Sequence, residues 1–262
     1  MANLLRISLF QTYIDWEDKA SNMRHVYKML KRVAGKTDLA ILPETFSTGF
    51  TMNVKPLAET NNGETMTNLR QWAKSFDLAI TGSFIARADL HYYNRGFFLA
   101  PDGSNYYYDK RHLFSMGGEN KRFAPGKKRL IVPYKGWNIC LQICYDLRFP
   151  VWSRNTGKDY DLLIYVANWP EARRSAWQKL LPARAIENQA YVCGVNCVGT
   201  SPDKTTYCGG TRLYSPKGDI LKDAWGDCNS TRTVTIDKDE LNAFRTKFPA
   251  WRDADKFHFD AK

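Results

Sequence analysis

The sequence lacks a long apolar run and an export signal. None of its uncharged apolar stretches approaches the roughly 20 residues that a membrane-spanning helix needs. The N-terminal stretch MANLLRISLF is interrupted by Arg6, and it has neither the longer apolar region nor the small-residue cleavage site of a signal peptide. We therefore expect a cytoplasmic protein with no membrane partner.

Metal-binding and disulfide patterns are also missing. Cys140 and Cys144 lie four positions apart, as do Cys193 and Cys197, so neither pair has the C-x-x-C spacing of many zinc sites. The four histidines lie elsewhere in the chain. A chain of 262 residues can bury a full core without disulfide bonds. We predict no metal and no cofactor, and we expect most of the cysteines to be buried as small apolar residues.

No repeat, low-complexity segment or Gly/Ser-rich linker divides the chain, which favours a single domain over residues 1–262 with a C-terminal tail from about residue 238. The net charge of +11 favours anionic partners. However, no run of five or more basic residues occurs. A nucleic-acid-binding protein would usually concentrate its positive charge more than this chain does. We predict no nucleic-acid partner, and a basic nucleic-acid-binding module remains a remote alternative.

The spacing of apolar residues predicts an α/β protein. The predicted strands cover residues 4–10, 38–42, 78–85, 92–99, 106–108, 130–133, 137–143, 162–167, 191–198, 210–214 and 231–236. The predicted helices are 16–34 with Asp15 as N-cap, one with Met66, Leu69, Trp72, Ala73 and Phe76 on one face, a short one that begins at Pro150, and 174–189, which Pro182 should kink or restart. These are more strands than one Rossmann sheet uses, so the pattern favours two packed mixed sheets with helices outside.

Polar residues follow four of the predicted strands. Glu44, Lys110, Cys144 and Asn168 each come directly or almost directly after an apolar or aromatic run. Ligands of open α/β sheets bind at the carboxyl ends of strands, so these ends are where we expect chemistry.

Cys144 is a candidate nucleophile. It lies where a strand turns into a short predicted helix, and a helix N-terminus lowers the pKa of a thiol. Backbone N–H groups near Tyr145 could hold an oxyanion there. No histidine is placed as its partner, so a carboxylate such as Glu44, expected to be partly desolvated, could act as base while Lys110 supplies positive charge. The alternative interpretations are that Cys144 is a buried structural cysteine, that Glu44 is an acidic residue of a surface loop, and that Lys110 is an ordinary lysine at the end of a strand.

Six stretches of the chain resemble one family. LPETFSTGF, YDKRHLF and CYDLRFPVWSRN resemble the three catalytic blocks of the nitrilase (carbon–nitrogen hydrolase) superfamily, and YVANWPEARRSAWQ, ARAIENQAYV and KFPAWRDAD resemble its bacterial omega-amidase branch. The resemblance runs from Leu4 to about Phe257. It implies a four-layer α-β-β-α sandwich that pairs into a homodimer.

The resemblance also implies roles for individual residues. Glu44 matches the family's general base, Lys110 its lysine and Cys144 its nucleophile. Glu119 falls where the family carries a second glutamate that orients the lysine and the base, although the loop before it varies. All these positions are occupied, which argues against a catalytically dead scaffold.

The omega-amidase likeness implies hydrolysis of the terminal amide of short dicarboxylate monoamides, such as 2-oxoglutaramate or 2-oxosuccinamate, through a cysteine thioester. Arginine suits the free carboxylate of such a substrate. Arg148 is the first candidate for that contact, followed by Arg173 and Arg174, and Phe114 and Trp169 could wall the pocket. The alternative is another amidase of the superfamily, acting on N-carbamoyl amino acids or deaminated glutathione.

Overall fold

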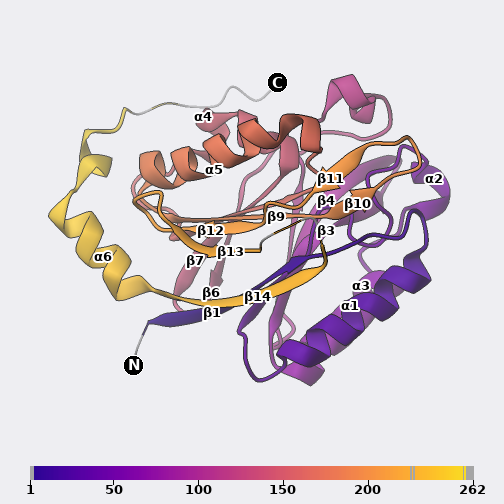
Figure 1. The fold of residues 1–262 in the computed structure, drawn as a ribbon, viewed down its shortest axis with the longest axis horizontal. Coiled ribbons are helices and arrows are strands. Elements are labelled where there is room, and N and C mark those ends of the chain that lie inside the picture. The colour runs from indigo at the N-terminus through magenta and orange to yellow at the C-terminus, as the bar shows by residue number, and fades with distance from the viewer. Residues whose placement is uncertain (1–2, 225, 227, 256, 258–262) are drawn as a thin grey trace.

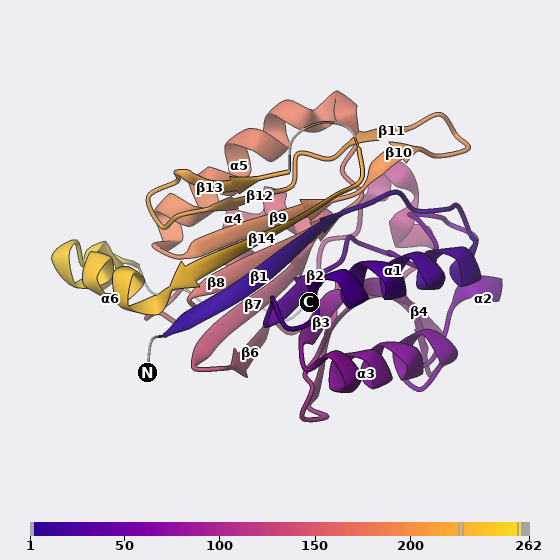
Figure 2. The ribbon, with the colours of Figure 1, turned by 60° about the horizontal axis from the view of Figure 1, so that its bottom comes forward.

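Two six-stranded β-sheets pack face to face, with helices on their outer surfaces (Figures 1 and 2). This computed structural model describes residues 3–224, 226, 228–255 and 257. No helix within these residues is both long enough and apolar enough to cross a bilayer.

The first sheet has the strand order β14-β1-β2-β3-β4-β5. Its strands are β1 (Leu4–Gln11), β2 (Leu39–Ile41), β3 (Ala79–Ala88), β4 (His91–Leu99), β5 (Asn105–Asp109) and β14 (Ser230–Asp237). Strands β1, β2 and β3 are parallel and the others join antiparallel, so the sheet is mixed. Helices α1 (Lys19–Val33) and α3 (Glu64–Phe76) cover its outer face, and the short α2 (Val54–Leu57) lies near the end of the sheet (Figures 1 and 2).

The second sheet has the order β13-β12-β9-β8-β7-β6. Its strands are β6 (Leu130–Tyr134), β7 (Trp137–Ile143), β8 (Leu162–Ala167), β9 (Tyr191–Asn196), β12 (Arg212–Tyr214) and β13 (Ile220–Asp223). Strands β7, β8 and β9 are parallel, and β8 is buried along its whole length. Helix α5 (Arg174–Asn188) packs on the outer face, with α4 (Pro150–Ser153) beside it.

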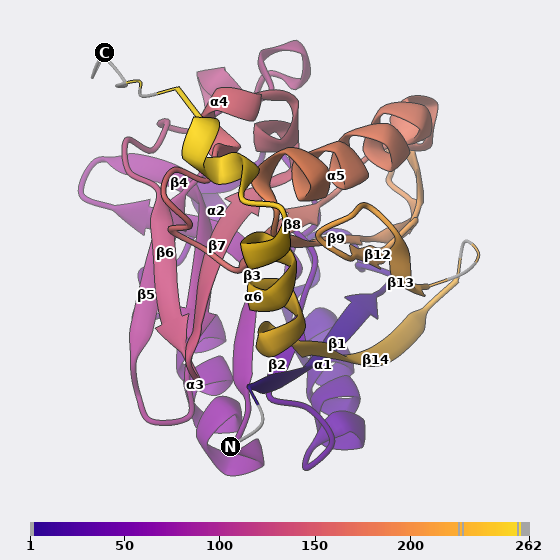
Figure 3. The ribbon, with the colours of Figure 1, turned by 90° about the vertical axis from the view of Figure 1, so that its left-hand side faces the viewer.

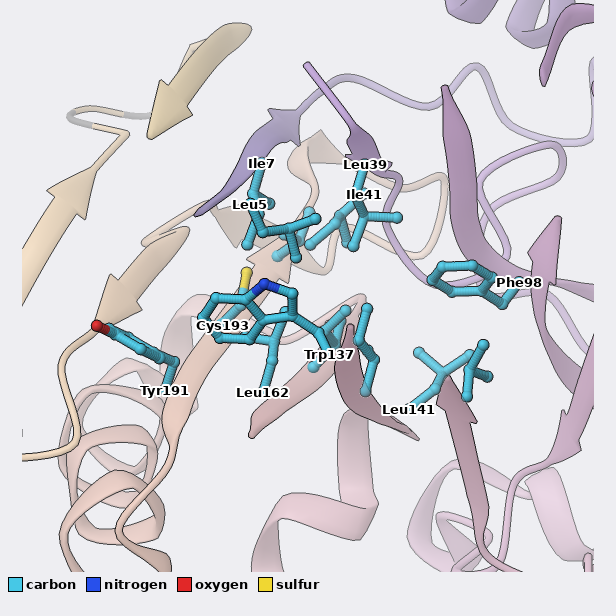
Figure 4. Packing of buried hydrophobic residues seen from close by; sticks show 14 of the residues in the cluster. Leu5, Ile7, Leu39, Ile41, Phe98, Trp137, Leu141, Leu162, Tyr191 and Cys193 are labelled. Carbon is cyan, nitrogen blue, oxygen red and sulfur yellow. The ribbon is translucent and has the colours of Figure 1, made fainter. Parts of the chain in front are cut away.

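The central core lies between the two sheets (Figure 4). Leu5, Ile7 and Ile41 of the first sheet meet Trp137 and Leu162 of the second, and all are buried. Full burial of one such aliphatic side chain contributes about 1.5–3 kcal/mol. Separate apolar clusters join each sheet to its own helices. The layers therefore run helix, sheet, sheet, helix, and the predicted four-layer α-β-β-α sandwich is confirmed.

One local prediction was wrong, and one part of a second was wrong. Asp18, not Asp15, caps α1: its carboxylate accepts from the backbone N–H of Ser21, whereas Asp15 accepts from the Ser21 hydroxyl. Of the two outcomes predicted at Pro182, a kink or a restart, the restart does not occur, because helix α5 continues through Pro182 to Asn188. Its neighbours Leu181 and Ala185 are fully buried, and this packing offsets the hydrogen bond that proline cannot donate.

Several short elements carry no strong sequence signal. Strands β10 (Val198–Thr200) and β11 (Thr206–Cys208) form a separate two-stranded sheet. The segment predicted as a tail begins with helix α6 (Lys238–Lys247), which lies near the end of the second sheet where β8 begins (Figure 3). There Arg245 pairs with Asp161 at 2.9 Å. Helix α6 therefore lies at the opposite end of β8 from Asn168.

Candidate active site

The predicted polar residues converge at one cavity of about 430 Å³. Glu44 and Lys110 follow β2 and β5 of the first sheet, while Cys144 and Asn168 follow β7 and β8 of the second. All four line the cavity. Strands from both sheets thus deliver their carboxyl ends to a shared site, as expected for α/β folds.

The floor of the cavity consists of Glu44, Lys110 and Cys144, with Glu119 directly beneath. Lys110 Nζ lies 2.8 Å from Glu44 Oε1 and 3.0 Å from Glu119 Oε1. The side chains of the two glutamates are 0% exposed and that of Lys110 is 1% exposed. Charges this deep persist only when they are paired and hydrogen-bonded, so the three groups depend on one another.

Asn94, in the middle of β4, joins the two carboxylates. Its Nδ2 donates to Glu44 Oε1 at 2.7 Å and to Glu119 Oε1 at 3.1 Å. Ser83 donates to Asn94 Oδ1 at 2.9 Å and thereby orients the amide. The sequence prediction missed Asn94 because an asparagine inside a strand, rather than at its end, gives no signal of its own.

Burial and charge shift the pKa values on the floor. Burial lowers the pKa of Lys110, but the carboxylates of Glu119 and Glu44 raise it by more, so the ammonium form is stable. Burial also raises the pKa of Glu119, and Glu44 adds to this shift while Lys110 opposes it. The backbone N–H of Phe114 donates to Glu119 Oε2 at 2.6 Å and fixes that carboxyl group.

Glu44 is held from the second sheet by Asn168. The backbone N–H of Asn168 donates to Glu44 Oε2 at 2.8 Å, and Asn168 Nδ2 donates to the Glu44 carbonyl oxygen at 2.6 Å. Cys197 Sγ in turn donates to Asn168 Oδ1 at 3.0 Å. The carboxylate of Glu44 is therefore fixed in orientation and directed toward Lys110 and Cys144.

Cys144 begins a 3-10 turn, Cys144–Arg148, in the left-handed backbone region with φ +43°. Non-glycine residues seldom adopt this conformation, and the surrounding structure must hold them in it. Burial raises the pKa of the Cys144 thiol well above its ordinary value, and the nearby Glu44 carboxylate raises it further. The predicted lowering was therefore wrong: the turn is short, and burial beside two carboxylates outweighs its dipole and Lys110.

Tyr145 occupies the second position of the 3-10 turn. Backbone N–H groups in the first turn of a helix have no partner within that helix. The Tyr145 N–H is thus a donor beside the thiol, on the residue that also lines the cavity. Its ring packs edge-on against Phe114 at 5.1 Å between centroids.

The mouth of the cavity consists of Phe114, Arg148, Trp169 and Arg173. The Arg148 guanidinium lies 5.3 Å from the centre of the Trp169 ring, and that of Arg173 lies 4.9 Å from the centre of the Phe114 ring. All four residues line the cavity, as predicted for them. Arginine stacked on an aromatic ring keeps its N–H edges available for an anion.

Arg174, the other predicted candidate, does not line the cavity. Its Nε donates to Cys208 Sγ at 3.0 Å, and its Nη2 pairs with Glu171 at 3.1 Å. Asp203, Thr205 and Tyr207 line the cavity without having been predicted. They belong to the β10–β11 hairpin, whose short strands give no distinctive sequence signal.

No group of three or more His, Cys, Asp or Glu side chains suited to a metal ion occurs among the described residues. The floor instead places a thiol, a carboxylate and an ammonium group together in one cavity. This set can deliver a sulfur nucleophile to a carbonyl carbon while a neighbouring base takes the proton.

Comparison with known proteins agrees with this geometry. The carbon-nitrogen hydrolase family model matches residues 6–246. The protein named Omega-amidase YafV from Yersinia enterocolitica is 44% identical over 255 residues, which cover 97% of this chain and 98% of that protein. The 2-oxoglutaramate amidase of Bacillus subtilis is 30% identical over 254 residues, which cover 95% of this chain and 97% of that protein.

A solved structure matches equally well. XC1258 from Xanthomonas campestris, a CN-hydrolase superfamily protein with an arsenic adduct in its active site, superposes with a TM-score of 0.96 at 42% identity. The match covers 98% of this chain and 99% of that chain. The fold, the floor of the cavity and these relatives lead to one conclusion: the chain belongs to the carbon–nitrogen hydrolase family.

Proposed function

We propose that this protein is an omega-amidase, which hydrolyses the terminal amide of short dicarboxylate monoamides such as 2-oxoglutaramate or 2-oxosuccinamate to the acid and ammonia. The observation that carries this proposal is one cavity with Glu44, Lys110 and Cys144 on its floor and two arginines at its mouth. Relatives named omega-amidase and 2-oxoglutaramate amidase support the same substrate class.

The first half of the reaction forms a thioester. Cys144 Sγ attacks the amide carbonyl carbon while Glu44, which lines the same cavity, takes the thiol proton. Lys110 and the Tyr145 N–H stabilise the oxyanion, and loss of one such donor costs roughly 3–4 kcal/mol in comparable sites. Glu44 then gives the proton to the departing nitrogen, the C–N bond breaks, and ammonia leaves.

The second half hydrolyses the thioester. A water molecule occupies the place of the departed ammonia, and Glu44 takes a proton from it as its oxygen attacks the thioester carbon. The C–S bond breaks, the proton returns to sulfur, and the acid leaves. Glu119 orients Lys110 and Asn94 orients Glu44 throughout, because Glu119 pairs with the ammonium group and Asn94 donates to the Glu44 carboxylate.

The mouth of the cavity selects the substrate. Arg148 is our first candidate for the free carboxylate, and Arg173 is the second. Phe114 and Trp169 hold these guanidinium groups by cation–π contacts. An amide acid thus reaches the floor with its amide foremost and its carboxylate at the mouth.

We further propose that residues 1–262 act as a single carbon–nitrogen hydrolase domain, with residues 238–262 as its C-terminal tail, and that the protein is a homodimer of the cytoplasm. The family match over residues 6–246 supports the single domain. Cys140, Cys193 and Cys197 are buried and form no disulfide bond, which suits a reducing compartment. Light scattering coupled to gel filtration tests the dimer.

The experiment that tests the activity is an ammonia-release assay on a panel of amides. The panel contains 2-oxoglutaramate, 2-oxosuccinamate, an N-carbamoyl amino acid, deaminated glutathione and a neutral amide of similar length. The highest kcat/KM is expected for the two dicarboxylate monoamides. Mass spectrometry of the acid-quenched reaction should find an acyl adduct on Cys144. Preference for another member of the panel would replace the proposed substrate class.

A further inference from the structure

Asp146, two residues beyond Cys144, lies outside the cavity, yet its carboxylate accepts hydrogen bonds from several neighbouring groups. Its side chain is 0% exposed, and it is not among the residues that line the cavity. Oδ1 lies 2.9 Å from the backbone nitrogen of His112 and 2.8 Å from His112 Nδ1. Oδ2 accepts from the Tyr108 hydroxyl at 2.7 Å and from the backbone N–H of Ile143 at 3.0 Å.

These partners belong to two segments that are far apart in the sequence. Tyr108 and His112 flank Lys110 at the end of β5, in the first sheet. Ile143 directly precedes Cys144 at the end of β7, in the second sheet. The carboxylate of Asp146 therefore joins the segment with the lysine to the turn with the nucleophile.

The segment around Lys110 is fixed independently of Asp146. The backbone N–H of Lys110 donates to the Asn94 carbonyl oxygen at 3.0 Å, and Gly126 donates to the Lys110 carbonyl oxygen at 2.9 Å. The turn with Cys144 has the strained conformation described above. Asp146 therefore holds the strained Cys144 turn against the well-anchored Lys110 segment.

We propose that Asp146 is a positioning residue, which docks the nucleophile turn onto the Lys110 segment and so sets the place of Cys144 Sγ relative to the ammonium group and Glu44. The imidazole of His112 is one of the two side chains through which it acts. An ionised carboxylate only accepts hydrogen bonds, so His112 donates from Nδ1.

The imidazole of His112 is held in place for this task. It stacks on Phe149 with ring centroids 3.8 Å apart and an angle of 7° between the planes. The Tyr108 hydroxyl is held in turn, because it accepts from Trp152 Nε1 at 3.0 Å. Both side-chain donors to Asp146 are thus oriented by their own neighbours.

A variant pair separates positioning from packing at His112. In His112→Asn, the side-chain amide nitrogen replaces Nδ1 as the donor while the stacked ring is lost. In His112→Phe, the stacked ring remains while the donor is lost. The proposal expects His112→Asn to retain at least tenfold more kcat than His112→Phe. Equal values, or the reverse order, would overturn it.

Asp146→Asn replaces an acceptor oxygen by an N–H donor, and Asp161→Asn is its matched control. Asp161 is also a buried carboxylate and pairs with Arg245 at 2.9 Å, but it precedes β8 at the opposite end of that strand from Asn168. Misplacement of a reacting group by about 1 Å can cost 10²-fold in rate. We expect kcat to fall about 100-fold in Asp146→Asn, with KM nearly unchanged, and to stay within about threefold in Asp161→Asn at a similar loss of Tm.

This inference rests on the proposed function, so a second measurement that needs no turnover accompanies the kinetics. Alkylation of Cys144 by chloroacetamide, followed by mass spectrometry, depends on the placed thiol but not on the natural substrate. We expect alkylation at least tenfold slower in Asp146→Asn than in Asp161→Asn. Failure of the wild type to hydrolyse any amide would overturn the proposed function alone, whereas equal alkylation rates in the two variants would overturn the positioning role.

Discussion

The floor and the mouth of the cavity hold their charges by different means. On the floor, Glu44, Lys110 and Glu119 are buried and paired within 3.0 Å. At the mouth, Arg148 is exposed and rests on the face of Trp169. A rigid floor keeps the reacting groups in one geometry, whereas a solvent-accessible mouth lets a substrate anion enter and leave. The difference separates the chemistry of the reaction from the choice of substrate.

The largest expected effect is at the floor. Cys144→Ala should reduce ammonia release on the order of 10⁴-fold or more, because the nucleophile is removed while the cavity remains. Binding of the substrate, measured by calorimetry, should persist because the mouth is untouched. Cys193→Ala is the matched control, since Cys193 is a fully buried cysteine of the central core. Substantial residual turnover in Cys144→Ala would exclude Cys144 as the nucleophile.

At the mouth, substitution should change binding more than turnover. Arg148→Leu should raise KM about tenfold for the acid-bearing amide and leave KM for a neutral amide of equal length within about twofold, since a hydrogen bond to a charged group contributes about 1.5–3 kcal/mol. Arg173→Leu, measured beside it, decides between the two candidates. Equal effects of Arg148→Leu on both amides would remove that residue from substrate recognition.

The neutral thiol on the floor predicts a pH dependence of stability. Folding raises the pKa of Cys144 above its ordinary value of 9.0, so the folded chain keeps a proton that the unfolded chain releases as the pH rises past 9. The contribution of this thiol to the free energy of unfolding is fully present below pH 9 and is progressively lost as the pH rises above 9. The free energy of unfolding should thus fall more steeply in the wild type than in Cys144→Ala, by up to about 1.4 kcal/mol per pH unit.

Urea unfolding between pH 8 and pH 10 under reducing conditions measures this slope. Other buried thiols, such as Cys193, have raised pKa values too, and they contribute equally to both proteins. Parallel slopes in the wild type and Cys144→Ala would show that the thiol ionises as readily in the folded as in the unfolded chain.

The smallest expected effect concerns Cys197, which supports the floor from behind. Cys197→Ala removes the donor to Asn168 Oδ1, and Asn168 orients Glu44. Because a thiol is a weak donor, kcat should fall only about twofold, and Cys197→Ser should restore it. A loss above about tenfold in both variants would indicate a packing defect rather than a lost hydrogen bond.

The sequence could predict the residues that follow strands, because an apolar run that ends in a polar residue is visible in one chain. Glu44, Lys110, Cys144 and Asn168 were found in this way. Asn94 could not be found, since its function depends on two carboxylates that are distant in sequence.

The direction of the Cys144 pKa shift was also out of reach. It depends on how much of the surroundings is protein rather than water, and this follows only from the packing of both sheets. Element boundaries failed for a similar reason. The backbone N–H of Ser21 donates to Asp18, whereas its hydroxyl donates to Asp15. Which of the two aspartates caps the helix depends on the path of the chain before α1.

The pairing of β14 with β1 has a consequence for synthesis. Strand β1 leaves the ribosome long before its outer neighbour β14, which ends only at Asp237. A nascent chain must therefore hold the edge of its first sheet open while all of the second sheet is being translated. During that interval the exposed edge of β1 is a place where chaperones or other chains can bind, and the sheet is completed only when the last strand has emerged.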